Sequence, residues 1–63
     1  MPNAQLYIKR SEHKLKQSDV AKMLNISMQS YHLKEVGKSD FKQSEMVKLA
    51  KLFDATLDEL FMN

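Results

Sequence analysis

Apolar residues recur at helical spacing in the middle of the chain. Val20, Ala21 and Leu24 stand at positions i, i+1 and i+4, which places them on one side of a helix. Asn25 follows directly, and asparagine is, after glycine, the residue that most readily takes the left-handed conformation at a helix C-terminus. The pattern therefore predicts a short helix that stops at Asn25.

A second helix is predicted directly after this break. Ile26 has the apolar character of a residue packed between two helices, and Ser27 is a favourable N-cap. The helix should begin at Met28 and end near Gly37, the only glycine in the chain, because glycine suits the position just past a helix end. Residues 17–37 therefore indicate a helix-turn-helix, whose second helix can enter a DNA major groove.

The N-terminal segment predicts a further helix over residues 4–13. Asn3 is expected to cap it, and Leu6, together with Tyr7, is expected to face inward. Arg10 lies one turn further along on the side of Leu6. The chain has one proline and no segment that alternates apolar and polar residues over a strand length, so β-structure has little support.

Two helices are predicted in the C-terminal part. They follow a loop over residues 38–43, in which Phe41 is the only large apolar residue and is expected to be an anchor. The fourth helix, residues 44–53, has an apolar face made of Met46, Leu49, Ala50 and Phe53. Thr56 and Glu59 form a capping-box pattern, so a short last helix is expected to carry Leu57, Leu60 and Phe61. The whole pattern predicts an all-α, five-helix domain over residues 1–63.

Charge is distributed unevenly along the chain. Residues 1–38 contain seven lysines and arginines against three acidic residues, a balance of +4, whereas residues 39–63 have a balance of −2. The basic half is the half that contains the predicted helix-turn-helix, and a polyanion is expected to dock there.

Composition narrows the function classes. The absence of cysteine excludes disulfides and thiolate metal sites and favours a reducing cytoplasm. No apolar run approaches the roughly 20 residues of a membrane span, so we expect a soluble protein without a membrane partner. His13 and His32 lack accompanying metal ligands, and no glycine-rich phosphate loop occurs. We therefore expect no enzymatic activity, no cofactor, no metal and no small-molecule substrate.

A set of residues spread over nearly the whole chain carries a family resemblance. It consists of Leu15, Gln17, Ala21, Leu24, Ile26, Ser27, Glu35, Gly37, Lys38, Leu49, Ala50 and the closing Leu57-Asp58-Glu59-Leu60-Phe61. In this order, without gaps, these residues resemble the Cro and phage-repressor class of helix-turn-helix proteins, the xenobiotic-response-element family. A second set, Tyr31, Lys34, Glu35, Gly37, Lys38, Phe41 and Glu45, looks like a subgroup of small phage-type regulators. The resemblance implies a lambda-repressor-like domain that binds operator DNA as a symmetric dimer and represses transcription.

The second helix of such a unit reads bases with its first turn and the outward side of its second turn. Met28, Gln29, His32 and Leu33 satisfy that condition, and residues 28–34 are expected to stand clear of the domain. Gln29 can pair with adenine through two hydrogen bonds, and His32 can donate to an acceptor. Met28 and Leu33 can contact thymine methyl groups, with core packing as the alternative for both.

Phosphate contacts are expected from residues around this helix. The predicted set is Lys16, Gln17, Ser27, Ser30, Lys38, Ser39 and Lys42. The resemblance places Gln17 at a helix start, where backbone N–H groups favour a phosphate. Lys16 and Lys42 stand where the family usually has a Ser or Thr cap. A cation there costs roughly 0.3–1 kcal/mol unless phosphates lie nearby, and a solvated loop is the alternative for residues 38–42.

The resemblance also implies two structural features. Arg10 and Glu35 occupy the positions of a buried ion pair that fixes the second helix of the unit against the first helix of the domain. Lys14 stands where the family prefers glycine, so the turn after the first helix is expected to be strained or differently shaped.

Dimerisation is expected because one helix reads only a few base pairs, whereas two related by a two-fold axis read half-sites about 34 Å apart. Leu57, Phe61 and Met62 are the predicted interface, with closure of the core as the alternative, and the dimer should be weak in solution. A protein-binding module such as an antitoxin is the alternative function. We expect that a chain ending at Asn63 lacks room for a second, oligomerising domain, which favours a Cro-like regulator that is associated with the nucleoid when bound to DNA; an excised domain is the alternative.

Overall fold

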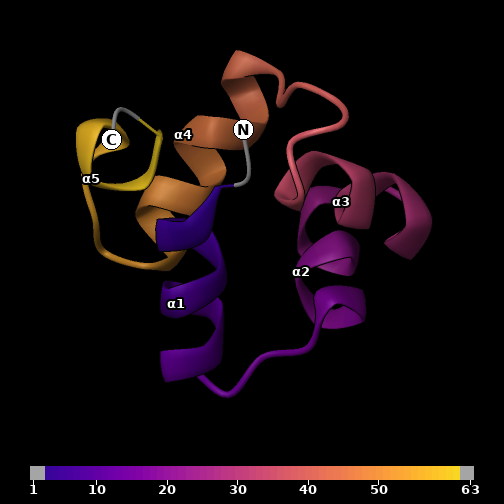
Figure 1. Cartoon of the computed structure of the whole chain (residues 1–63). Helices are drawn as coiled ribbons and strands as arrows, with labels where there is room; N and C mark the ends of the chain where they lie inside the picture. Colours follow the sequence, from indigo (N-terminus) through magenta and orange to yellow (C-terminus); the bar gives the residue numbers. More distant parts are fainter. Residues whose placement is uncertain (1–2, 62–63) are drawn as a thin grey trace.

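The computed structural model describes residues 3–61 and folds them into five α-helices, with no strand in that range (Figure 1). The helices are α1 (Ala4–Glu12), α2 (Gln17–Leu24), α3 (Met28–Glu35), α4 (Gln43–Leu52) and α5 (Leu57–Phe61). Helices α2 and α3 pack against each other on one side of the molecule, while α5 packs on α1 and α4 on the other. The predicted all-α, five-helix architecture is confirmed. Among the helices described, none combines the length and the apolar character needed to cross a bilayer.

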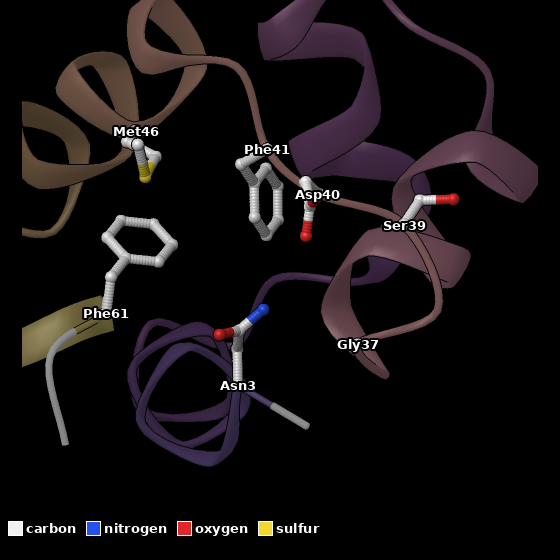
Figure 2. A pocket seen from close by; sticks show the side chains of 7 residues that line it. All are labelled: Asn3, Gly37, Ser39, Asp40, Phe41, Met46 and Phe61. Carbon is white, nitrogen blue, oxygen red and sulfur yellow. The ribbon is translucent and has the colours of Figure 1, made fainter. Parts of the chain in front are cut away.

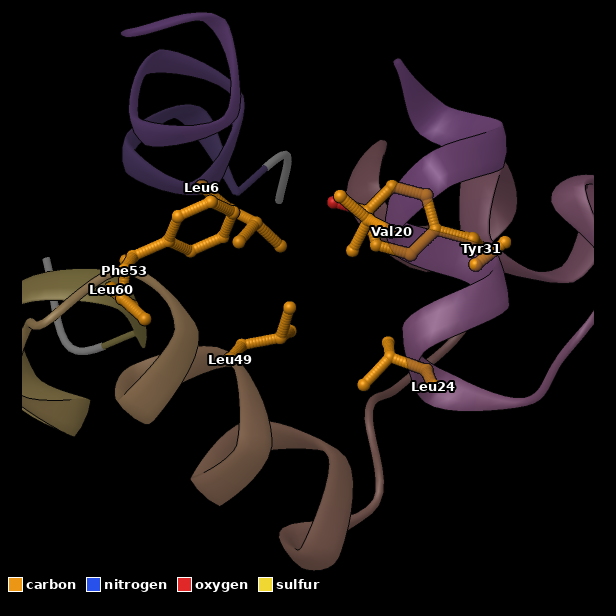
Figure 3. Close-up of a cluster of buried hydrophobic side chains, with 8 residues drawn as sticks. Leu6, Val20, Leu24, Tyr31, Leu49, Phe53 and Leu60 are labelled. Atoms are coloured by element: carbon orange, nitrogen blue, oxygen red, sulfur yellow. The ribbon is translucent and has the colours of Figure 1, made fainter. Parts of the chain in front are cut away.

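One shared core holds the helices together (Figure 3). It consists of Leu6, Val20, Ala21, Leu24, Tyr31, Leu49, Phe53 and Leu60. Each of the five helices supplies at least one of these residues, and Phe53 directly follows α4. Helices of five to ten residues are too short to be stable alone in water. Burial of each large apolar side chain contributes about 1.5–3 kcal/mol, and the fold therefore depends on all five helices at once.

Four helices end in the same way, with a left-handed residue directly after the last turn. These residues are Lys14 (φ 56°), Asn25 (φ 59°), Gly37 (φ 88°) and Asp54 (φ 50°). In each case the next backbone N–H group bonds a carbonyl five residues back, as in the 3.0 Å bond from Ile26 to Ala21. The predicted helix breaks at Asn25 and Gly37 are confirmed. Lys14 takes the left-handed backbone conformation that glycine adopts most easily.

Side-chain caps start two of the helices. The Oγ of Ser27 accepts from the Ser30 N–H at 3.0 Å, as the sequence predicts. Thr56 and Glu59 form the predicted capping box, since each side chain accepts from the backbone N–H of the other at 3.0 Å. These local signals fix where α3 and α5 begin.

Several details differ from the sequence-based expectations. Helix α1 ends at Glu12, one residue early, and α4 spans Gln43–Leu52 instead of 44–53. Tyr7 is 56% exposed, so its predicted inward position is wrong; the Arg10 guanidinium lies 5.2 Å from the centre of its ring. Asn3 occupies the N-cap position of α1, but its side chain makes no cap hydrogen bond there.

Candidate nucleic-acid interface

One side of α3 faces outward and carries the side chains predicted to contact bases. Met28 is 56% exposed, Gln29 and His32 are exposed, and Leu33 is half-buried. Their spacing puts the four on one side of the helix, while Tyr31, on the other side, is completely buried. The side chains predicted to contact bases are thus presented together, and core packing is excluded for Met28.

The carboxyl-terminal end of α3 is held by the buried Glu35 carboxylate. Arg10 donates to it twice, from Nε at 2.9 Å and from Nη2 at 3.0 Å. Tyr31 Oη donates at 2.6 Å and Gln17 Nε2 at 3.2 Å. The residues expected to form an ion pair are therefore in contact, and the same carboxylate also joins α2 to α3.

These contacts set the ionisation of the cluster. Burial raises the pKa of Glu35, but the hydrogen bonds from Arg10, Tyr31 and Gln17 outweigh burial and hold the pKa below its ordinary value. Burial, together with the bond to Glu35, raises the pKa of Tyr31. At neutral pH the carboxylate is therefore charged, and the phenol keeps the proton that it donates.

A second buried ion pair holds the same end of α3, and sequence analysis missed it. Lys34 is 9% exposed, and its Nζ donates to both carboxylate oxygens of Glu45, at 2.8 and 2.9 Å. The expectation that residues 28–34 stand clear of the domain is therefore wrong for Lys34, whereas Tyr31 faces inward as the sequence predicts. Tyr31 and Lys34 stand at i and i+3 and therefore share one side of the helix, and this spacing could have predicted that Lys34 faces inward.

Asn3 bonds this end of α3 from the side of α1. Its backbone N–H donates to the Glu35 carbonyl and its Nδ2 to the Lys34 carbonyl, both at 3.0 Å. Carbonyls in the last turn of a helix have no partner within it. Asn3 therefore stands at the predicted N-cap position of α1, but its side chain caps the carboxyl-terminal end of α3 instead.

The residues predicted to contact phosphates are all at least partly accessible. Lys16, Ser27, Lys38, Ser39 and Lys42 are exposed, and Gln17 and Ser30 are half-buried. The side chains of two of the seven also have hydrogen bonds within the protein, since the Ser27 hydroxyl caps α3 and the Gln17 amide donates to Glu35.

Lys16 and Lys42 are the N-cap residues of α2 and α4, and neither side chain caps its helix. Instead, the Asp19 and Glu45 carboxylates accept the backbone N–H groups of Lys16 and Lys42, each at 2.8 Å. Both helix starts therefore carry a cation on the surface and a carboxylate one turn later.

The ion pairs reduce the number of cations that are available to a polyanion. Arg10 and Lys34 are neutralised by buried carboxylates, and Lys9 lies 3.8 Å from Glu12. The exposed lysines outside these three ion pairs in the basic half of the chain are Lys14, Lys16, Lys22 and Lys38. Lys42 adds to them from the start of α4.

A hollow of about 320 Å³ lies beside the C-terminal helix (Figure 2). It is lined by Asn3, Gly37, Ser39, Asp40, Phe41, Met46 and Phe61. Phe41 is confirmed as an anchor, because its ring packs edge-on against Tyr31 and Phe61, with centroids 6.0 and 5.5 Å away. Of the predicted dimer residues, Leu57 is 38% exposed, Phe61 is half-buried, and Met62 lies outside the described residues.

Comparison with known proteins agrees with this geometry. Over residues 6–60 the chain matches a protein-family model described as helix-turn-helix. Searches of curated proteins and of solved structures found no match. Within residues 3–61 no group of three or more His, Cys, Asp or Glu side chains could hold a metal ion. The family match covers most of the chain, and the two packed helices and the exposed face of α3 agree with it. The chain therefore belongs to the Cro/C1-type helix-turn-helix family of DNA-binding regulators.

Proposed function

We propose that this protein is a Cro-like, phage-type repressor that binds a palindromic operator as a homodimer. Each domain places the outward side of α3 in a major groove, where Gln29 reads adenine and Met28, His32 and Leu33 contact neighbouring base edges. The observation that carries the proposal is the exposure of this face on a helix whose other end is fixed.

The exposed residues at the start of α2 and after α3 are suited to contact the DNA backbone, which supports the proposal. Lys16 and Gln17 lie at the start of α2, while Lys38, Ser39 and Lys42 lie after α3. Phosphate contacts of this kind fix the register of a protein on a duplex, and they leave sequence discrimination to side chains in the groove.

The size of the domain supports a dimer. Its largest dimension is 24 Å, whereas successive major grooves on one face of DNA are about 34 Å apart. One copy therefore cannot place helices in two successive grooves. Leu57, Phe61 and Met62 form the proposed interface, and the hollow beside Phe61 would let a second copy pack against aromatic surface.

Selection of bound sites from random-sequence duplex DNA tests the proposal. We expect an enriched palindrome with half-sites about ten base pairs apart, bound by two copies of the chain. The Gln29→Ala variant, selected in parallel, should lose preference at one position in each half-site. Failure to enrich any duplex at low ionic strength would contradict the proposal.

A protein-binding module such as an antitoxin is the second candidate, because the hollow beside Phe61 offers aromatic surface to a partner protein. A chain that captures a partner protein through this hollow and ignores duplex DNA would favour this second candidate.

We place the proposed repressor in the bacterial cytoplasm, associated with the nucleoid when it is bound to DNA.

A further inference from the structure

Lys34 is placed where a lysine would be expected to contact DNA, yet its charge points into the protein. It lies one turn after Ser30, a predicted phosphate contact, and near Lys38, another. Only 9% of it is exposed, and its ammonium donates to both oxygens of Glu45, which is itself 6% exposed. The Phe41 ring covers the pair, with its centroid 6.0 Å from the Lys34 nitrogen.

The Glu45 carboxylate joins two elements. Its Oε1 accepts from Lys34 Nζ at 2.8 Å and from the backbone N–H of Lys42, also at 2.8 Å. One oxygen atom thus links the last turn of α3 to the first turn of α4. The loop 36–42 is closed by this link, and the loop contains the predicted phosphate contacts after α3.

Hydrogen bonds keep the Glu45 carboxylate in its charged form. Burial raises the pKa of Glu45, but hydrogen bonds from Lys34 and from the Lys42 backbone lower it by more, so the pKa lies below its ordinary value. Separating the partners would leave a desolvated charge without compensation. The arrangement therefore resists rearrangement when DNA approaches.

We propose that Lys34 is a positioning residue that makes no contact with DNA, and that Glu45 holds it so that α3 and the loop 36–42 meet DNA in one fixed relative orientation. This inference rests on the proposed function, because it concerns the same surface. It separates Lys34 from Lys38, which has the same charge and lies four residues further along. Lys38 neutralises a phosphate, whereas Lys34 is already neutralised by Glu45.

The salt dependence of binding to random-sequence duplex DNA tests the assignment. Each lysine that neutralises a phosphate contributes about one to the slope of log affinity against log salt. We expect Lys38→Gln to reduce the slope by about one per domain and Lys34→Gln to leave it unchanged. Equal reductions in the two variants would overturn the proposal.

Removal of Lys34 alone can unfold so small a domain, because it leaves the buried Glu45 without its partner. A second variant that should remain folded therefore tests the same assignment. Lys34→Met combined with Glu45→Gln removes both buried charges, keeps an acceptor for the Lys42 N–H, and should fold, as judged by circular dichroism. Its slope should equal that of the unsubstituted protein. A slope lower by one would show that Lys34 contacts DNA, contrary to the proposal.

The orientation is tested by comparing two glutamates that have the same local role. Glu45 and Glu59 each accept the N–H of a helix N-cap residue, but only Glu45 holds a buried lysine. Glu45→Gln should reduce the ratio of operator affinity to random-DNA affinity roughly tenfold, about the loss of one base contact. Glu59→Gln removes the same charge and should leave the ratio unchanged.

Equal ratios for the two glutamate variants would overturn the positioning role. A protein that binds neither operator nor random DNA before any substitution would instead refute the proposed function. The two failures are therefore distinguishable within one series of titrations.

Discussion

The two ends of α3 differ in how their side chains are bonded. At the carboxyl-terminal end, Glu35 accepts four hydrogen bonds and Lys34 donates two, all to partners in other elements or to Tyr31. At the amino-terminal end, the Ser27 hydroxyl accepts a hydrogen bond from the Ser30 N–H, while Gln29 and His32 face solvent. Side chains that read bases must keep their donors and acceptors free, so the orientation of the helix has to be fixed at its other end.

The largest expected effect comes from breaking the fixed end. Arg10→Met removes one partner of a buried pair and leaves Glu35 charged without compensation, so the free energy of unfolding should fall by about 3–5 kcal/mol. Lys9→Met is the matched control on the same helix, because Lys9 pairs with Glu12 on the surface and should cost at most about 1 kcal/mol. Urea unfolding measures both, and similar losses would show that burial of the Arg10–Glu35 pair is unimportant.

Acid should destabilise the same end. The pKa values of Glu35 and Glu45 are lowered in the folded protein, while an unfolded glutamate titrates near pH 4.3, at roughly its unperturbed pKa. Their stabilisation is therefore complete above that pH and is lost as the pH falls through the folded values. Urea unfolding from pH 7 to pH 3 should show this decline, with a shallower slope for Glu45→Gln. A stability that stays constant to pH 3 would contradict it.

The free end should affect binding and leave folding unchanged. Gln29→Ala removes an exposed amide, so stability should change by no more than about 0.5 kcal/mol. Operator affinity should fall by about 1–3 kcal/mol if the amide pairs with adenine. Titration of the selected operator and a thermal melt of the same preparation test both expectations, and a melt that shifts as much as the affinity would count against this division of roles.

A smaller effect is expected at the turn beside the fixed end. Lys14 has a positive φ, and Arg10 Nη1 donates to the next carbonyl, that of Leu15, at 2.9 Å. Glycine takes this conformation without the cost that a side chain imposes, so Lys14→Gly should stabilise the protein by about 1 kcal/mol. Lys14→Ala removes the same charge but keeps a Cβ, so a comparable gain from alanine would assign the effect to charge.

The smallest effect is expected at the lysines in N-cap positions. Lys16→Thr supplies a cap to α2 and removes a cation from a helix start, which should raise stability by about 0.3–1 kcal/mol. If DNA phosphates lie near Lys16, the salt dependence of binding should also become less steep. Lys42→Thr should behave in the same way at α4. Unchanged melting temperatures and salt slopes in both variants would refute the idea that these lysines exchange capping for phosphate affinity.

Local signals were sufficient to predict the five helices. Asn25, Ser27 and Gly37 act through their own backbone conformation or through a partner three residues away, so their roles follow from the sequence. The face formed by Met28, Gln29 and His32 also follows, because helical spacing determines which side chains share a side.

Contacts between distant segments were harder to predict. Glu45 is eleven residues from Lys34, and the pair depends on how the loop 36–42 turns and where Phe41 packs. Asn3 looked like a local cap, but it bonds the carbonyls of residues more than thirty positions away. Helical periodicity does not encode such pairings, since the fold must exist before the partners meet.

The division of labour along α3 has an evolutionary consequence. Tyr31, Lys34 and Glu35 hold the helix to the rest of the protein, whereas Met28, Gln29 and His32 have no described role in folding. Substitutions at the second group can therefore accumulate without loss of a folded protein. A lineage that carries this scaffold can acquire new target sequences by changing a few solvent-facing positions, and related DNA-binding regulators in one cell can diverge until they ignore each other's sites.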